Sequence, residues 1–267
     1  MKKWGIPGML LLVLSSCQQE INYVIPEIQQ QCRVTNGYYY GGSGGLIDST
    51  SFVYNNGRLI RIDGEYEYIT YEYSGNNISL VRIFDRQTST VMQTDSVKYN
   101  SSNKITQMVT WYYDPFFPDT VRFRLLFNYN NDRLDRVNEY TTWFSSLGEE
   151  TDTTISIFHH NAAGNMDKLW LEDPQGFRFD SVIYVFDNNP NYFNAAHPHF
   201  FLFDPFFQLQ VGLTPHLPYF YSTNNVTRFL LDGGLDYPIQ YGIDSLNNVT
   251  SVMMMGDDYV KYKYECP

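Results

Sequence analysis

Hydrophobic and polar residues alternate along most of this chain, which is the pattern of β-strands with one buried face. Phe123, Leu125 and Phe127 fall on one face of a segment whose other face carries Arg122 and Arg124. Residues 260–265 repeat this alternation near the end of the chain. Since no window of helical length shows a clear 3.6-residue period, the pattern predicts antiparallel strands.

Clusters of Asn, Gly and Asp separate these segments. The unit Tyr-Asn-Asn-Gly-Arg-Leu at 54–59 returns as Tyr-Asn-Asn-Asp-Arg-Leu at 129–134. Looser copies of the unit follow Tyr73, Tyr99, Phe158 and Tyr241. Because Asn, Asp and Gly tolerate positive φ, these clusters predict short hairpin turns, and the whole reads as a degenerate repeat.

The predicted fold class is all-β, an antiparallel meander of hairpin repeats that curls into a half-open or closed barrel-like sheet. A flat sheet of this length would leave two edges unpaired, and the many Tyr and Phe rings suit a curved interior. We expect one β-rich domain over 32–267. An irregular aromatic insert at 188–220 interrupts it, because five prolines there exclude a long central strand or helix. The insert either presents an interaction surface or closes one end of the sheet as core.

Composition supports a globular protein. The 267-residue chain is 43% hydrophobic and 17% aromatic, with a net charge of -11. It lacks a run of Lys or Arg that would neutralise phosphates, so nucleic acid is not an expected partner.

The N-terminus reads as an export signal. Lys2 and Lys3 precede an apolar stretch at 6–14, which is too short to span a bilayer. The following Leu-Ser-Ser-Cys at 14–17 resembles the bacterial lipobox, which implies a signal peptide over 1–16 and a lipid on Cys17. Residues 17–31 would then tether the domain to the outer membrane, on a face that the sequence leaves open. An ordinary signal peptide with an incidental cysteine is the alternative.

With these features the chain resembles Bacteroidota lipoproteins of a domain-of-unknown-function type, which carry hairpin repeats similar to YD or Rhs repeats and a porin-like β fold. The lipobox and the two Tyr-Asn-Asn units carry the resemblance, together with the Asn-Pro segment at 186–191 and Asn-Asn-Val-Thr at 224–227. The resemblance implies no catalytic residues.

Candidate catalytic and metal-binding motifs have simpler explanations. Residues 41–45 fit G-x-S-x-G, but a strand is predicted after them where a nucleophile elbow needs a helix. Metal binding by His197, His199 and His216 would need further ligands and second-shell acceptors, and His159 and His160 point to opposite faces of a strand. We expect no enzyme, metal or cofactor. The acidic residues that could be imagined as a glycosidase pair are more simply solvated loop charges: Asp114, Asp119, Glu149, Glu150 and Asp152.

Aromatic residues at predicted strand ends and in the insert form the candidate ligand or partner surface. Such rings stack on sugars or dock proteins when exposed, and plug the ends of a curved sheet when buried. The candidates are Trp111, Tyr112, Trp143, Trp170, Phe206 and Phe207.

The function expected from the sequence is that of a non-catalytic outer-membrane lipoprotein, a binding or structural module of the envelope whose partner is a protein or a glycan. A glycan-active enzyme, or an accessory glycan-binding protein of a polysaccharide-uptake system, is the alternative. After lipidation of Cys17, Cys32 and Cys266 are the remaining thiols of an exported protein, so a disulfide between them is expected, with two buried free thiols as the alternative.

Overall fold

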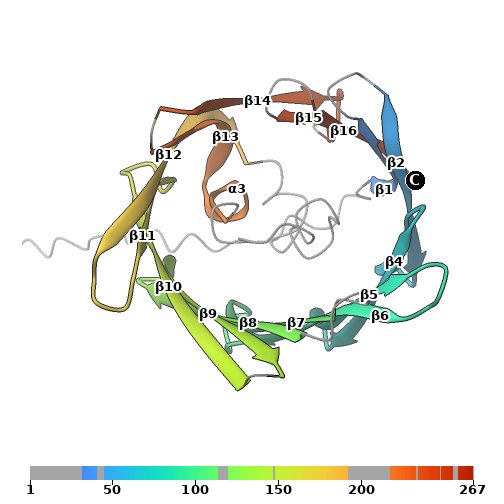
Figure 1. Ribbon diagram of the computed structural model, residues 1–267. Helices are drawn as coiled ribbons and strands as arrows, with labels where there is room; N and C mark the ends of the chain where they lie inside the picture. Colours follow the sequence, from blue (N-terminus) through green and yellow to red (C-terminus); the bar gives the residue numbers. More distant parts are fainter. Residues whose placement is uncertain are drawn as a thin grey trace, which may run out of the picture.

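The computed structural model is a closed antiparallel barrel of sixteen strands that follow one another in chain order (Figure 1). It describes residues 32–40, 45–113, 120–146, 148–191, 217–232, 234–246, 248–254 and 258–266. The first eight strands are β1 Arg33–Tyr40, β2 Leu46–Asn55, β3 Arg58–Asp63, β4 Glu67–Ser74, β5 Asn77–Asp85, β6 Val91–Tyr99, β7 Ile105–Tyr113 and β8 Thr120–Asn130. The others are β9 Arg133–Ser145, β10 Gly148–His160, β11 Met166–Glu172, β12 Arg178–Pro190, β13 Asn224–Leu231, β14 Asp236–Ile243, β15 Val249–Met254 and β16 Asp258–Glu265, and a short helix, α3 Pro218–Tyr221, precedes β13.

The predicted all-β meander is therefore confirmed, and the sheet closes fully. β1 pairs with β16 from Arg33 opposite Glu265 to Tyr40 opposite Tyr259, so the first and last strands leave no open edge between them. A disulfide joins Cys32 to Cys266, with Cα atoms 4.1 Å apart and a sequence separation of 234. The disulfide therefore lies beside a seam that backbone hydrogen bonds already close.

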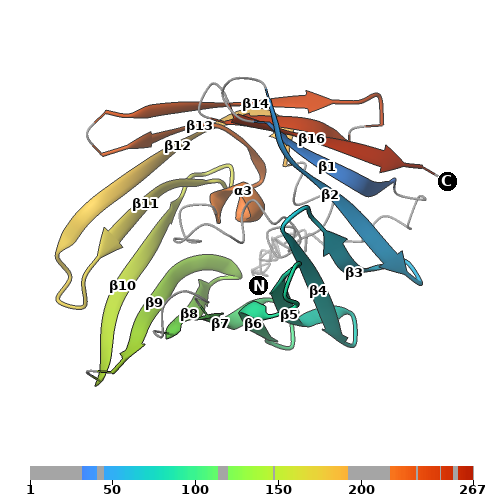
Figure 2. The ribbon, with the colours of Figure 1, turned by 45° about the vertical axis from the view of Figure 1, so that its right-hand side comes forward.

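The turns predicted from Asn, Gly and Asp all connect strands at the same end of the barrel, which we call the asparagine end. Positive φ angles occur there at Asn56, Gly57, Asn131 and Asp132. Only residues that tolerate this backbone region can form such tight turns, which is why the repeat keeps these residue types at these positions. The segment between β12 and β13 also begins and ends at the asparagine end, whereas the odd-numbered strands β1 to β15 end at the opposite end (Figure 2).

At the asparagine end, a tyrosine at the end of a strand is hydrogen-bonded to the preceding strand in several of the repeats. Its hydroxyl donates a hydrogen bond to the backbone carbonyl of an apolar residue at the start of the preceding strand. The pairs are Tyr73 to Leu59 at 2.8 Å, Tyr129 to Ile105 at 2.9 Å, Tyr241 to Val226 at 2.7 Å and Tyr264 to Val249 at 2.7 Å. The repeated tyrosine thus has a repeated structural function.

The helix α3 lies inside the barrel (Figures 1 and 2). Leu217 and Phe220 are 0% and 2% exposed and belong to the hydrophobic core. The buried Asn191, at the end of β12, donates from Nδ2 to the carbonyls of Tyr219 and Ser222, at 2.7 and 2.9 Å. Residues 217–220 of the predicted insert are therefore core, whereas residues 188–190 are exposed. The start of the predicted insert, residues 188–190, belongs to a strand instead, because β12 continues through Pro190.

No helix in the described part of the chain is both long and apolar enough to cross a membrane.

Candidate binding site inside the barrel

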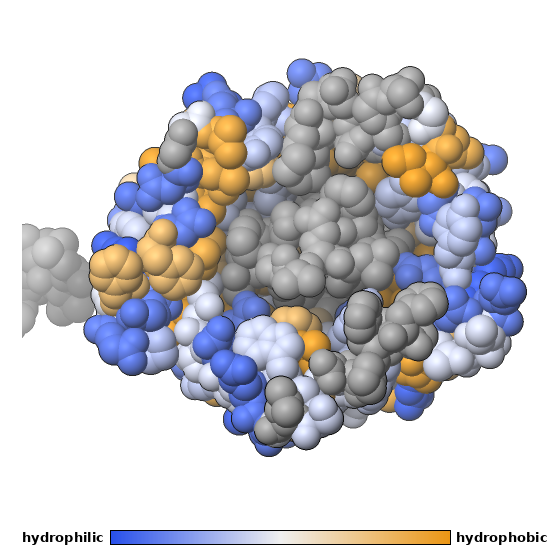
Figure 3. Space-filling view, viewed as in Figure 1, coloured by the Kyte–Doolittle hydropathy of each residue, from blue (hydrophilic) through white to orange (hydrophobic). Residues whose placement is uncertain are grey.

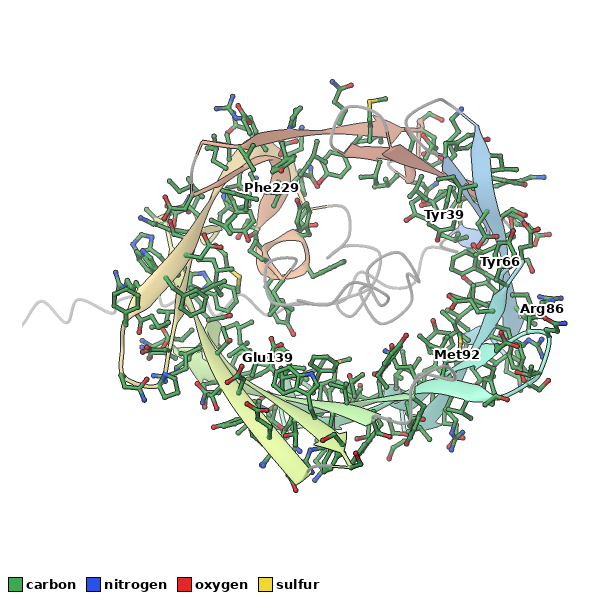
Figure 4. The ribbon with its side chains drawn as sticks, viewed as in Figure 1. Tyr39, Tyr66, Arg86, Met92, Glu139 and Phe229 are labelled. Atoms are coloured by element: carbon green, nitrogen blue, oxygen red, sulfur yellow. A yellow bond between two sulfur atoms is a disulfide. The ribbon has the colours of Figure 1, made fainter. Side chains whose placement is uncertain are left out.

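The two faces of the barrel wall differ in polarity. On β4 and β5, Ile69 pairs with Ile83 on the inner face, whereas the next pair, Thr70 and Arg82, lies on the outer face. Figure 4 places Glu139 on the inner side of the wall and Arg86 on the outer side. The hydrophobic core is built from the inner face of strands all round the barrel, and the inner wall is therefore predominantly apolar.

The outer wall carries charged side chains along many strands. Arg82 forms an ion pair with Glu72, and Arg228 lies 3.2 Å from Asp236. Hydrophilic residues surround the barrel in the end view, between smaller apolar patches (Figure 3). By strand register, further outward charges are Arg61, Lys98, Arg122, Arg124, Arg136, Lys168, Lys261 and Lys263.

The inner wall changes character from one end of the barrel to the other. Next to the asparagine end it presents Tyr and Phe rings, including Tyr71, Phe127 and Tyr184. Towards the opposite end it presents carboxyl groups from strands spread around the circumference. By strand register these groups, which we call the carboxylate belt, are Asp48, Glu67, Asp95, Glu139 and Asp180.

Burial perturbs several groups of the carboxylate belt. Desolvation raises the pKa of Asp95 to about 6, although hydrogen bonds from Thr110 and Gln93 oppose the shift. Burial and the nearby Asp48 raise the pKa of Glu67 to about 6. Burial alone raises the pKa of Glu139. Neutral, protonated forms of Asp95 and Glu67 are therefore accessible near neutral pH.

Asp95 is fully buried and has its own hydrogen-bond partners. The Nε2 of Gln93 lies 3.0 Å from both of its carboxylate oxygens. Thr110, opposite Asp95 on β7, adds a side-chain hydrogen bond. This satisfied network fixes the inner face of β6 and β7.

The structure does not bring the aromatic candidates together in one surface. Trp111 lies on the outer face of β7, where it stacks against Phe144 with ring centroids 5.5 Å apart. The guanidinium of Arg122 lies over both rings, 5.5 Å from the centroid of Trp111 and 5.2 Å from that of Phe144. The rings of Trp111 and Phe144 are therefore already in contact with each other and with Arg122.

Trp170 lies on the outer face of β11, in a separate cluster. Arg178 is 4.7 Å and Lys168 is 5.1 Å from its ring centroid, and His159 meets the ring edge-on. Arg178 also bonds to Glu172 at 2.6 Å. Cationic side chains of the same chain therefore already surround this indole.

Tyr112 and Trp143 have the inward parity of their strands, in contrast to Trp111. Both align with Val121 across β7, β8 and β9, towards the end opposite the asparagine end. They are 40% and 39% exposed. Of the four aromatic candidates in the described part of the chain, these two belong to the same face as the carboxylate belt.

Several other sequence candidates can be placed. His159 and His160 do face opposite ways: His159 Nδ1 lies 2.6 Å from Asp167, and His160 bonds to a backbone carbonyl. Glu149 lies 3.5 Å from Arg122 on the outer wall. Glu150 and Asp152 are exposed on β10. Among the described residues no group of three His, Cys, Asp or Glu side chains could hold a metal ion.

The remaining candidates lie outside the described residues. They are Cys17, residues 41–44 of the glycine-rich segment, Asp114, Asp119, His197, His199, His216, Phe206 and Phe207.

Sequence reasoning did not single out the carboxylate belt. A signal was present, because Asp95 occupies the same alternating phase as Val97 and Tyr99, and Glu139 the same phase as Val137. A carboxylate at a position where the pattern expects an apolar side chain indicates an inward-facing acid.

Comparisons with known proteins concern the fold. No known protein family and no curated protein matches the sequence. A solved porin-like protein from Bacteroides vulgatus ATCC 8482 superposes with a TM-score of 0.50 and 10% identity, covering 87% of this chain and 98% of its own. The chain has a porin-like β-barrel fold.

Two further solved structures are similar at lower TM-scores. A porin-like protein from Bacteroides uniformis ATCC 8492 gives a TM-score of 0.49 with 13% identity, over 87% of this chain and 98% of that one. The Tc holotoxin pore of Photorhabdus luminescens gives 0.38 with 11% identity, over 83% of this chain and 11% of that one.

Proposed function

We propose that this chain is a non-catalytic binding protein of the bacterial envelope, anchored to the outer membrane through a lipid on Cys17, with its barrel outside the bilayer and its ligand held inside the barrel. The observation that carries the proposal is the polarity of the wall, which is predominantly apolar inside and charged outside.

The outer wall argues for a barrel outside the bilayer. A barrel that spans a membrane presents an apolar band to lipid, and each Arg or Lys at the middle of that band costs about 2–4 kcal/mol. Here Arg82, Arg124 and Lys261 are outward-facing residues within strands. Anchoring by a lipid would hold such a barrel at the membrane without placing its wall in hydrocarbon.

The inner wall argues for a ligand inside the barrel. Sixteen strands enclose a lumen wider than inward side chains can fill, and membrane porins of this size line that lumen with polar groups and water. An apolar wall is stabilised instead when apolar side chains or an apolar ligand pack against it. α3 supplies some of these apolar side chains at the asparagine end. The inner wall continues from α3 towards the opposite end of the barrel.

The outer aromatic clusters give less support to glycan binding, the alternative from the sequence. Stacking on a sugar needs an open ring face. Trp111 is stacked against Phe144, and Trp170 lies against Arg178 and Lys168. We therefore place the binding function inside the barrel.

Fractionation of cells that express the full chain tests the anchor and the position of the barrel together. Wild type is expected in the outer-membrane fraction, and Cys17→Ala is expected to leave it. Ser16→Ala, which keeps a small residue before the cysteine, is the control and should stay in the membrane. A Cys17→Ala protein that remains in the outer membrane after alkaline extraction would show that the barrel itself is embedded.

A further inference from the structure

The charged groups on the inner wall all have the same sign. The carboxylate belt places acids on β2, β4, β6, β9 and β12, so they surround the lumen towards the end opposite the asparagine end. Within the described strands, each Lys and Arg lies on the outer face or next to a turn. Within the described strands, the inner wall therefore carries acidic groups without a facing Lys or Arg.

The rest of the chain contains no Lys or Arg that could neutralise this charge. Apart from Lys2 and Lys3, every lysine and arginine of the sequence lies in the described part. Residues 192–216 contain neither type. No Lys or Arg of the folded domain therefore supplies a counter-charge to the ionised groups of the belt.

Two polar side chains, one on β9 and one on β10, lack a hydrogen-bond partner among the described residues. Glu139 faces inward opposite Leu125 and forms no hydrogen bond or ion pair with any described residue. Ser156 is 0% exposed, and its hydroxyl has no hydrogen-bond partner among the described residues. The register places Thr154 opposite Glu139, so Ser156 lies one diagonal position away on the same face. Glu139 is only partly buried, whereas the Ser156 hydroxyl is fully buried. A buried hydroxyl is normally satisfied, so the unsatisfied Ser156 indicates a missing partner beside Glu139.

Aromatic side chains accompany the carboxylates on the inner wall. Phe123 lies opposite Thr110, the partner of Asp95, and Tyr39 lies opposite Asp48. Aromatic faces next to carboxylates favour cations that also have apolar surface, because the ring attracts the charge and packs against the rest of the molecule. A wide lumen with low-dielectric walls also focuses the negative potential of the belt.

We propose that the inner wall of the barrel binds an organic cation with an apolar body, such as an alkyl or aromatic amine, and that Glu139 and Ser156 contact its ammonium group. This proposal rests on the proposed function, because it assigns a ligand class to the same lumen. The Glu139 carboxylate and the Ser156 hydroxyl accept hydrogen bonds from the ammonium, and the apolar wall covers the remainder.

Three dansyl probes of similar size test this assignment on the full chain by fluorescence titration: dansyl cadaverine, which is a cation, its neutral N-pentyl analogue, and the anion dansyl aminohexanoic acid. We expect the cation to bind at least about 10-fold more tightly than the neutral probe, as one charge-assisted hydrogen bond implies. Added salt should weaken the binding of the cation and leave that of the neutral probe unchanged.

Glu139→Gln is expected to lower the affinity for the cation by about 10-fold, with little change for the neutral probe. Glu72→Gln on the outer wall is the matched control and should bind all three probes as wild type does. If Glu139→Gln does not fold, the salt dependence of wild type still decides the question.

The outcomes separate the two proposals. Equal binding of the three probes, or tighter binding of the anion, overturns the cation assignment and leaves the lumenal binding function in place. Failure of all three probes to bind overturns the lumenal binding function, and the cation assignment with it.

Discussion

His160 at the end of β10 bonds through Nε2 to the backbone carbonyl of Leu134 at the start of β9, at 2.7 Å. In the hairpins of Tyr73, Tyr129, Tyr241 and Tyr264, a tyrosine hydroxyl makes the corresponding bond. The imidazole therefore replaces the phenol in one unit of the repeat. Its second nitrogen, Nδ1, is buried and has no hydrogen-bond partner in the described part of the chain.

This relationship predicts that His160→Tyr is tolerated and His160→Ala is not. The alanine variant loses the bond to Leu134 and should reduce the free energy of unfolding by about 1 kcal/mol, whereas tyrosine should stay within about 0.5 kcal/mol of wild type. His159→Ala is the control, since His159 makes an exposed ion pair with Asp167. Urea unfolding measures all three variants, and equal loss in His160→Tyr and His160→Ala would contradict the proposed equivalence.

The Asp95 carboxyl predicts a specific pH dependence of stability. Its pKa is about 6 in the folded protein and near 3.9 in an unfolded chain, so protonation favours the folded state. The stabilisation from the protonated form is complete below about pH 4 and is lost as the pH rises through about 6.

Asp95→Asn should therefore gain about 2 kcal/mol of stability at pH 8 relative to wild type, and lose much of the slope between about pH 4 and pH 6. Gln93 can reverse its amide to accept from the new asparagine, so the buried hydrogen bond is retained. Thermal unfolding over a pH series measures the effect, with Glu72→Gln as the outer-wall control. An unchanged slope in Asp95→Asn would assign the titration to other groups.

Asn191 is predicted to fix α3 inside the barrel. Asn191→Ala removes the donor to the carbonyls of Tyr219 and Ser222 and should cost about 2–3 kcal/mol of stability, since both acceptors lie in a buried region. Asn189→Ala, whose exposed side chain bonds only to Asp187 among the described residues, should change stability by less than about 0.5 kcal/mol. Similar unfolding midpoints for the two variants would show that α3 is held by apolar packing alone.

The disulfide is predicted to add stability to a barrel that closes without it. Cys32→Ser with Cys266→Ser should still fold, because β1 and β16 remain hydrogen-bonded, with stability lowered by about 2–4 kcal/mol. Mass spectrometry of the alkylated, unreduced protein should find neither thiol modified. Two alkylated thiols per chain would show that the bridge is not formed in the cell.

Local patterns in the sequence were sufficient for the strands and turns. Alternation with a period of two assigns Phe123, Leu125 and Phe127 to one face, and the register of β8 confirms that face as the inner one. Positive φ at Asn56 and Asn131 likewise depends on residues that adjoin in sequence. Both properties are local, so neither requires knowledge of the rest of the fold.

The tertiary structure decided how these elements combine. Whether the sheet stays open or closes depends on strand number, tilt and register summed over the whole chain, and here β1 meets β16. Trp111 and Tyr112 are adjacent in sequence and were both assigned to the candidate surface. In the barrel they lie on opposite faces of the wall. The carboxylate belt brings Asp48 and Asp180 to one lumen although their residue numbers differ by 132. Such a site depends on which residues face the inside of the closed barrel. The alternation in the sequence shows that two faces exist, but it does not show that one of them encloses a lumen.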